Sequence, residues 1–200
     1  MRRASLRRSE LCAVELLCDQ KFDSIFDLSR PAIERFTLPV SAVFDTFSSY
    51  CEKTGTPKKI LCDAGTDGLT VRRGGQYIIL YNDLVENERR RTFTLAHEVG
   101  HILLSHAGEH PEVEEREANA FAASLLCPAI AARYLAHRDG RPLTEQLLTG
   151  YFFLSAEAVK NRLRDLRRPA PPPADSEIAL LLSLFGKMPE RDKPTTEDYV

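Results

Sequence analysis

The sequence contains two histidines and a glutamate at a spacing that suits metal-dependent hydrolysis. These residues are His97, Glu98 and His101, in the run His-Glu-Val-Gly-His. Residues four apart lie on one face of a helix, so both imidazoles can reach a single ion. Glu98 would project beside them and could take a proton from water. About 0.01 such patterns are expected by chance in this composition, so the motif predicts a catalytic metal site.

A catalytic zinc site usually has three protein ligands and one open position, so the motif needs a third ligand. An acidic cluster opens a predicted helix that follows Pro111, and it comprises Glu112, Glu114, Glu115 and Glu117. Acidic residues in a first turn also suit the helix dipole, so most of the four fit a surface role. Glu115 shares a helical face with Asn119, whereas Glu117 points about 160° away. Periodicity leaves Glu115 and Glu117 as alternatives.

Apolar residues surround the motif at helical spacing and predict that its helix is anchored in a core. They are Phe93, Ala96, Gly100, Leu103 and Leu104. Glycine costs about 1 kcal/mol in a helix interior relative to alanine. Gly100 therefore predicts close packing by another element.

The segment before the motif predicts helices followed by a small sheet. Helical spacing covers residues 9–19 and a stretch from Pro31 or Pro39 to residue 53. Residues 59–62, 69–72 and 76–81 are rich in β-branched and aromatic side chains and predict strands. Gly74-Gly75 predicts a hairpin turn. Strand 76–81 is a candidate for an edge strand that holds an extended substrate, and the alternative is an ordinary interior strand.

The segment after Pro128 predicts more helices. Residues 142–148 and 156–166, the latter capped by Ser155, resemble a helix-turn-helix. Five basic residues there could contact DNA phosphates, although exposed arginines are usually solvated: Lys160, Arg162, Arg164, Arg167 and Arg168. A stiff proline-rich linker follows over residues 169–173, then a short apolar helix over 178–185. Residues from about 189 onward are predicted to be disordered.

Composition favours a cytoplasmic protein with one main folded unit. The chain has 200 residues, 43% of them hydrophobic. The sequence shows neither an uninterrupted apolar run of about 18 residues nor a convincing signal peptide, so no membrane association is expected. Five cysteines without a Cys-x-x-Cys pair favour reduced thiols. The net charge of −2 gives no global attraction to nucleic acid, and direct contact with it is not expected.

Three runs of residues together resemble the ImmA/IrrE family of metallo-endopeptidases. They are residues 91–101 around the motif, the Glu115-x-x-Ala-Asn-x-Phe-Ala-Ala run and the Leu-Leu-Cys-Pro run at 125–128. The resemblance implies that Glu115 is the third ligand, with Glu117 as the runner-up. Asn119 would then hold the ligand's carboxylate in place. Cys127 stands where the family commonly has methionine, and we expect it to pack rather than to bind metal.

The resemblance implies an α+β fold with a zincin-like core. This core, at residues 1–128, would combine a small antiparallel or mixed sheet with surrounding helices. A helix-turn-helix-like extension at 129–168 and a tail at 169–200 would follow. The expected metal is zinc, with manganese or iron as alternatives.

The resemblance also implies a protein substrate, typically a helix-turn-helix transcriptional repressor. His97, His101 and Glu115 would hold the ion and Glu98 would act as the general base. The alternative is a non-proteolytic regulatory or DNA-binding protein, such as a toxin-antitoxin component, in which the metal site is structural. Tyrosines and histidines elsewhere could stabilise the oxyanion, and the sequence does not separate them: Tyr81, Tyr134, Tyr151, His106, His110 and His137.

Overall fold

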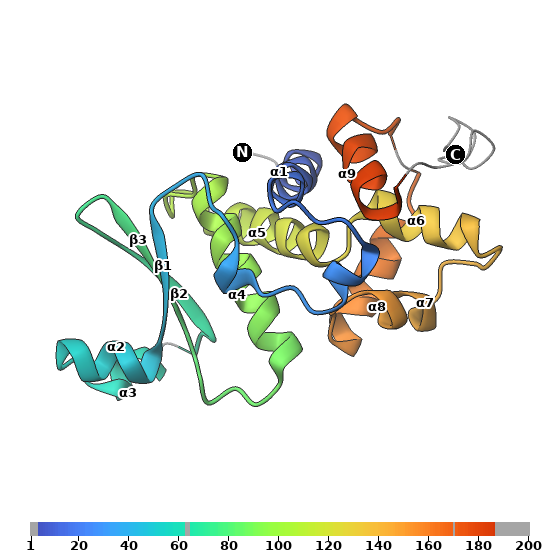
Figure 1. Ribbon diagram of the computed structural model, residues 1–200. Coiled ribbons are helices and arrows are strands. Elements are labelled where there is room, and N and C mark those ends of the chain that lie inside the picture. The colour runs from blue at the N-terminus through green and yellow to red at the C-terminus, as the bar shows by residue number, and fades with distance from the viewer. Residues whose placement is uncertain (1–3, 63–64, 170, 187–200) are drawn as a thin grey trace.

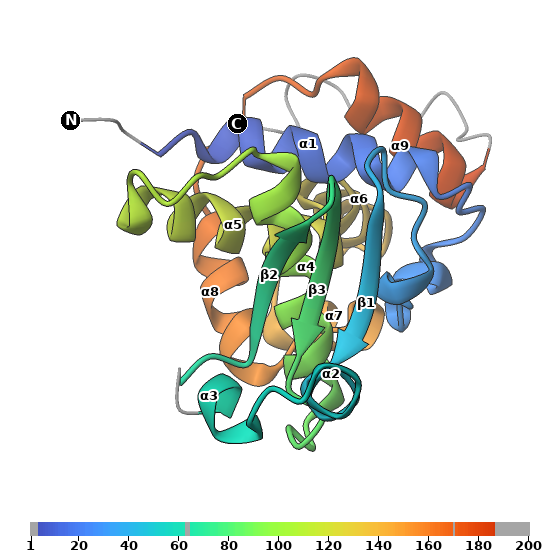
Figure 2. The ribbon, with the colours of Figure 1, turned by 90° about the vertical axis from the view of Figure 1, so that its left-hand side faces the viewer.

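A three-stranded sheet forms one end of the molecule, and helices fill the rest (Figure 1). The computed structural model describes residues 4–62, 65–169 and 171–186. Figure 2 looks onto the sheet, with two long helices behind it and another helix running across the top. The described chain is therefore an α+β fold with a small mixed sheet, as the sequence predicts.

The sheet has the strand order β1-β3-β2. Its strands are β1 (Ala42–Thr46), β2 (Gly68–Arg73) and β3 (Gln76–Tyr81). β1 runs parallel to β3, and β2 pairs with β3 antiparallel. Gly74 and Gly75 join β2 to β3 with φ angles of 59° and 82°, which is the backbone of a primed hairpin turn. The predicted hairpin is confirmed, and β3 is the central strand, so of the two positions considered for it the interior one is confirmed and the edge one is wrong.

Two other predictions for the first third of the chain are wrong. The expected helix up to residue 53 is divided into a short 3-10 turn, η2 (Ile33–Arg35), strand β1 and helix α2 (Phe47–Thr54). The expected strand at 59–62 lies in helix α3 (Lys58–Cys62). β1 forms because it pairs with β3 more than 30 residues later, and local periodicity carries no trace of that pairing.

The apolar run in this segment has only three residues, Ile60 to Cys62, which is too short to separate strand from helix. Leu61 is buried beside Phe47 of α2 and Leu80 of β3 in a small apolar cluster. This contact packs α3 against the end of the sheet, and the packing stabilises the helical turn.

Three long helices build the centre of the molecule. α1 (Leu6–Asp19) and α4 (Glu88–Leu103) both pack against α5 (Pro111–Leu126). A Cβ atom placed on Gly100 would lie only 3.0 Å from the Cδ1 atom of Phe121, so the predicted close packing at this glycine is confirmed. α4 also packs against β2 and β3, which places the motif helix between the sheet and α5.

The C-terminal helices continue the same core. They are α6 (Ala129–Arg138), α7 (Glu145–Tyr151), α8 (Ala156–Leu166) and α9 (Asp175–Phe185). The Ser155 hydroxyl caps α8 by accepting the N–H of Ala158, as predicted. The expected apolar helix corresponds to α9, which packs on α1 and α6. The expected disordered segment after residue 189 lies outside the described residues.

One of the basic residues expected to face solvent on α8 is buried. The side chain of Arg162 is 2% exposed, and its Nε donates to the carbonyl oxygen of Cys127 at 2.9 Å. Arg162 is therefore not a phosphate contact, because its guanidinium holds the end of α5. Lys160, Arg164, Arg167 and Arg168 are exposed.

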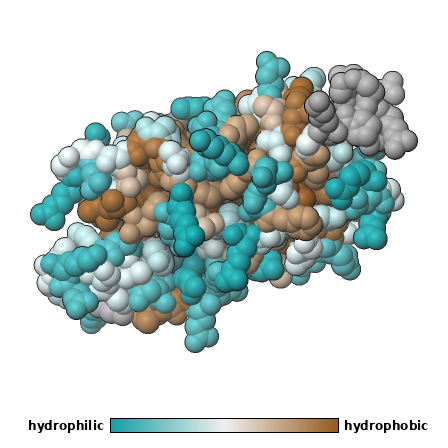
Figure 3. Space-filling model, viewed as in Figure 1, coloured by the Kyte–Doolittle hydropathy of each residue, from teal (hydrophilic) through white to brown (hydrophobic). Residues whose placement is uncertain are grey.

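The stretch Pro111–Arg138 has the length and apolar composition of a membrane span, but 72% of its most apolar window is buried inside the protein. It comprises α5 and α6, which form core in this fold. The surface shown in Figure 3 mixes hydrophilic residues with small apolar patches. One patch accompanies α9, where Ile178 and Leu182 are 38% and 45% exposed.

Candidate metal centre

Helix α4 positions the motif because its two faces have different chemistry. Asn87 caps the helix by accepting the N–H of Arg90, and Leu95, Ala96 and Val99 bury one face in the core. The side chains of His97 and His101 project from the other face toward α5. Both imidazoles are mostly sheltered, with 15% and 21% of their side-chain surfaces exposed.

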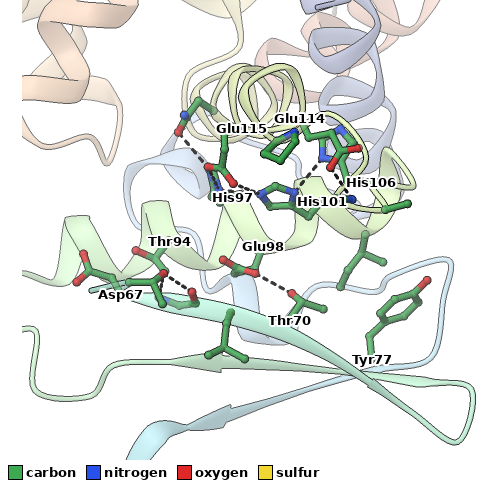
Figure 4. Close-up of a pocket in the computed structure, with 18 of the residues that line it drawn as sticks. Asp67, Thr70, Tyr77, Thr94, His97, Glu98, His101, His106, Glu114 and Glu115 are labelled. Atoms are coloured by element: carbon green, nitrogen blue, oxygen red, sulfur yellow. Dashed lines mark hydrogen bonds and ion pairs between the residues drawn. The ribbon is translucent and has the colours of Figure 1, made fainter. Parts of the chain in front are cut away.

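The side chains of His97, His101 and Glu115 converge on one point (Figure 4). The two histidine Nε2 atoms lie 2.9 Å apart. Glu115 of α5 places Oε2 at 3.2 Å from the Nε2 of His97 and Oε1 at 3.3 Å from that of His101. The structure thus brings together the three residues that the sequence suggests as metal ligands.

The spacing of these ligand atoms fits a bound zinc ion. Tetrahedral ligands with bonds of about 2.0–2.1 Å to one ion lie about 3.3 Å from each other. Burial lowers the pKa of His97, and burial together with the neighbouring imidazole of His97 lowers the pKa of His101 to about 4. Both rings are therefore neutral at physiological pH and offer lone pairs to a cation.

A hydrogen bond fixes the orientation of His97. Its Nδ1 lies 3.1 Å from the Oδ1 of Asn119, one turn along α5 from Glu115. An amide oxygen only accepts, so His97 carries its proton on Nδ1 and presents the Nε2 lone pair to the site. Asn119 thus bonds to the imidazole of His97 and not to the carboxylate of Glu115, which is the partner that the sequence suggests.

His101 is oriented by His106, which the sequence offers only as one of several candidates for stabilising the oxyanion. Its Nδ1 lies 2.9 Å from the Nδ1 of His106, and the Nε2 of His106 lies 3.2 Å from the Oε2 of Glu117. The carboxylate accepts from His106, so the Nδ1 of His106 is free to accept the proton of His101. The Nε2 of His101 is then left free to bind an ion, and a second histidine stands between it and the carboxylate, unlike the direct carboxylate–histidine–metal arrangement of many zinc sites.

The chain turns back at the end of α4, and this turn brings the imidazole of His106 into contact with that of His101. The N–H of His106 donates to the carbonyl of His101, and the N–H of Ser105 donates to that of Ile102. Ser105 has a φ of 57°. These two bonds and the left-handed residue between them form a Schellman motif, in which glycine is the usual residue. The turn therefore serves to place His106.

Glu117 has a supporting position, unlike Glu115. The carboxylate of Glu117 is 3% exposed and accepts the backbone N–H of Ser5 at 2.7 Å as well as His106. Glu115 is half exposed at its side chain and faces the two ligand imidazoles. Glu114 accepts the N–H of Gly108 and fixes the loop between α4 and α5. Of these glutamates, only Glu115 contributes to the ligand cluster.

Glu98 lies on the sheet side of the site. Its Oε2 accepts the hydroxyl of Thr70 in β2 at 2.8 Å. Burial raises the pKa of Glu98 to about 7, and the bond from Thr70 opposes this rise. Gly68 allows the close approach, because a Cβ atom there would lie against the side chain of Thr94 and 3.4 Å from the Cγ of Glu98.

A cleft of about 880 Å³ contains the site, and its walls are α4, the start of α5 and strand β2. The loop at its entrance is held by an ion pair between Asp67 and Arg90 of α4. β2 is the edge strand of the sheet, so its outer backbone groups have no strand partner in the described chain. The strand beside the site is therefore β2 and not β3.

Comparison with known proteins identifies one matching family. A family model described as the IrrE N-terminal-like domain matches residues 60–164, which is more than half of the chain. The match covers β2, β3, both site helices and every residue of the ligand cluster. No curated protein and no solved structure matches the chain significantly.

Proposed function

The chain belongs to the peptidase family of IrrE N-terminal-like domains, and on this premise we propose that it is a zinc-dependent endopeptidase. The family implies a metallopeptidase and a metal ion, which agrees with the resemblance to ImmA/IrrE enzymes. The observation that carries the proposal is the approach of His97, His101 and Glu115 to one another, with Glu98 beside them in an open cleft.

The proposed site residues have separate tasks. His97, His101 and Glu115 would hold the zinc ion. When bound there, zinc supplies Lewis acidity that activates water and polarises a peptide carbonyl. Glu98 accepts the proton of the attacking water on the carboxylate oxygen that Thr70 does not occupy, and it returns that proton to the leaving amine nitrogen.

An open coordination position favours catalysis over a structural metal. Structural zinc sites are closed by four protein ligands, whereas catalytic sites keep a position for water or substrate. In the described part of the chain, the cluster contains three ligating side chains and adjoins the cleft. This geometry supports the peptidase over the non-proteolytic regulatory alternative.

The test is the variant Glu98→Gln, which keeps the size of the side chain and removes the base. Zinc content measured by inductively coupled plasma mass spectrometry should stay at one ion per chain, and peptide cleavage should fall by more than about 100-fold. Manganese and iron should be measured in the same samples. Equal cleavage by the variant and the wild type at equal zinc content would refute the assigned role of Glu98 and the proposal with it.

We further propose a cytoplasmic helix-turn-helix repressor as the substrate. The support is the resemblance to ImmA/IrrE enzymes, which typically cleave such repressors. The experiment is to incubate the zinc-loaded protein with helix-turn-helix repressors encoded near its gene and to map new termini by mass spectrometry. If the protein cuts none of these repressors but does cut other proteins, the repressor is refuted as the substrate and the endopeptidase activity stands.

A further inference from the structure

Among the described residues that line the cleft, one is an arginine and none is a lysine. The arginine is Arg72 of β2, and it is exposed. No carboxylate of the described chain pairs with it, whereas Asp67 at the cleft entrance is paired with Arg90. Its guanidinium lies over the ring of Tyr77, 5.6 Å from the centroid. The cleft therefore contains one guanidinium that pairs with no carboxylate of the described chain.

The register of the hairpin places Arg72 on the face that meets the site. Side chains two residues apart on a strand share a face, so Arg72 lies on the side of Gly68 and Thr70. Gly68 contacts α4 and Thr70 bonds to Glu98. Tyr77 is the direct cross-strand partner of Arg72, and Figure 4 shows its ring rising from β3 into the cleft beside Thr70.

Tyr77 limits the freedom of Arg72. A guanidinium stacked over an aromatic ring keeps its N–H edge available while its face is occupied. Arginine with its planar fork binds carboxylates through charge-assisted hydrogen bonds. The pair therefore presents a partly preoriented carboxylate receptor one strand repeat away from the carboxylate of Glu98.

We propose that Arg72, stacked on Tyr77, is a specificity residue that binds a carboxylate of the peptide substrate. This inference rests on the proposed peptidase function, because it assigns a substrate class to the same cleft. Two residues along a strand span about 6.8 Å. A peptide that adds to the free edge of β2 would thus offer its acidic side chain about two residues from the bond cleaved beside Thr70 and Glu98.

Binding to an inactive variant tests the proposal without turnover. The probe is a set of nine-residue peptides of alternating Val and Thr, acetylated and amidated at their ends, with one Glu or one Gln at each position in turn. Fluorescence anisotropy with zinc-loaded Glu98→Gln protein should give about threefold to tenfold tighter binding for Glu at one or two positions. Equal affinities at every position, including no measurable binding of either series, would overturn the proposal.

Arg73 provides a matched control. It neighbours Arg72 but lies on the opposite face of β2, pairs with Gln76 and does not line the cleft. Arg72→Gln should abolish the preference for Glu, and Arg72→Glu should reverse it in favour of Lys peptides. Arg73→Gln should preserve the preference. An equal loss in the Arg73 variant would mean general charge attraction and would overturn the assignment to Arg72.

The chemistry of the peptide ends shows whether Arg72 binds a side-chain carboxylate or the C-terminal one. Amidated peptides offer only the side-chain carboxylate, whereas the same Gln peptides with a free C-terminus offer only the terminal one. We expect the preference in the amidated series. A preference confined to the free C-terminus would overturn the side-chain assignment and would indicate recognition of a chain end.

Cleavage of a randomised peptide library by the wild type separates this inference from the proposed function. Acidic residues should be enriched over their amides about two positions from the cut, and Arg72→Glu should replace that enrichment by Lys and Arg. Cleavage without such enrichment would refute the role of Arg72 and keep the endopeptidase. Arg72-dependent binding with no cleavage of any substrate would refute the endopeptidase and keep the receptor.

Discussion

His101 and His106 face each other through their Nδ1 atoms, which lie 2.9 Å apart. One of these atoms carries a proton and the other accepts it, because two donors or two acceptors would repel each other. Glu117 decides the direction, since it accepts from the far nitrogen of His106. The buried pair of His106 and Glu117 therefore controls which nitrogen His101 would offer to a metal ion.

Replacement of His106 should weaken metal binding. His106→Phe removes the acceptor for the Nδ1 proton of His101, and loss of such a supporting partner typically costs about 10- to 100-fold in metal affinity. Competition with a chromophoric zinc chelator measures the loss, and circular dichroism checks the fold. Unchanged zinc affinity in a folded variant would show that His101 needs no partner.

The hydrogen bonds from His101 through His106 to Glu117 end at the backbone N–H of Ser5, and this last bond can be tested separately. Ser5→Pro removes the backbone N–H that Glu117 accepts, whereas Ser5→Ala retains it. The Ser5 side chain forms no capping bond to α1, so Ser5→Ala is a clean control. We expect reduced zinc affinity for Ser5→Pro alone, and a smaller reduction than for His106→Phe.

Substitutions of Glu115 and Glu117 should have opposite effects on zinc binding and on the stability of the metal-free protein. Glu115→Gln should abolish tight zinc binding and leave the melting temperature of the metal-free protein nearly unchanged, because its side chain is half exposed. Glu117→Gln should destabilise the metal-free protein by about 1–3 kcal/mol, because it disturbs buried hydrogen bonds. Chemical denaturation in chelator and zinc titration distinguish the two. The reverse pattern would make Glu117 the ligand.

The buried carboxylate of Glu98 should make the metal-free protein less stable at high pH. Its pKa rises from 4.5 in an ordinary environment to about 7 in the folded chain. At pH values between these two pKa values, Glu98 is protonated in the folded chain and ionised in the unfolded chain. The free energy of unfolding therefore falls as the pH rises through 7. Glu98→Gln should therefore stabilise the metal-free protein by about 3 kcal/mol at pH 8 and by little at pH 4.

Denaturant titrations of the metal-free wild type and Glu98→Gln across this pH range measure the difference directly. Other groups titrate in both proteins, so the difference between the two curves isolates Glu98. A constant difference from pH 4 to pH 8 would contradict a raised pKa at this position.

Two helical glycines should respond oppositely to alanine. Gly100→Ala would force a methyl group to within 3.0 Å of the ring of Phe121, and overpacking of this kind typically costs about 1–3 kcal/mol. Gly150 of α7 has nothing within 4 Å of its would-be Cβ atom, so Gly150→Ala should be neutral or stabilising by up to about 1 kcal/mol. Thermal melting compares them. Equal effects would contradict the close approach of α4 and α5.

The parts of the site that local spacing can specify were predictable from the sequence. The i, i+4 histidines of α4, the helix that carries Glu115 and the glycine hairpin each follow a periodicity or a turn rule that operates within a few residues. Periodicity left Glu115 and Glu117 open, and the fold separates them because Ser5 and His106 occupy Glu117.

The parts that depend on distant pairing were not predictable. β1 looked helical because Val40, Val43 and Phe44 happen to fall at helical spacing, while its strand conformation comes from the parallel pairing with β3. The central position of β3 has the same origin. The position of His106 had no local signal, because a serine stands where a Schellman motif usually has glycine, and its partner Glu117 lies eleven residues away on another helix.

The unpaired edge of β2 also exposes the protein to unwanted self-association. A free strand edge can receive the edge of a second sheet as readily as a peptide, and proteins commonly protect such edges with short strands and charges. β2 has only six residues and ends with Arg72 and Arg73. Strand β2 thus has two of the features that natural sheets use to protect a free edge, a short length and charged residues at its end.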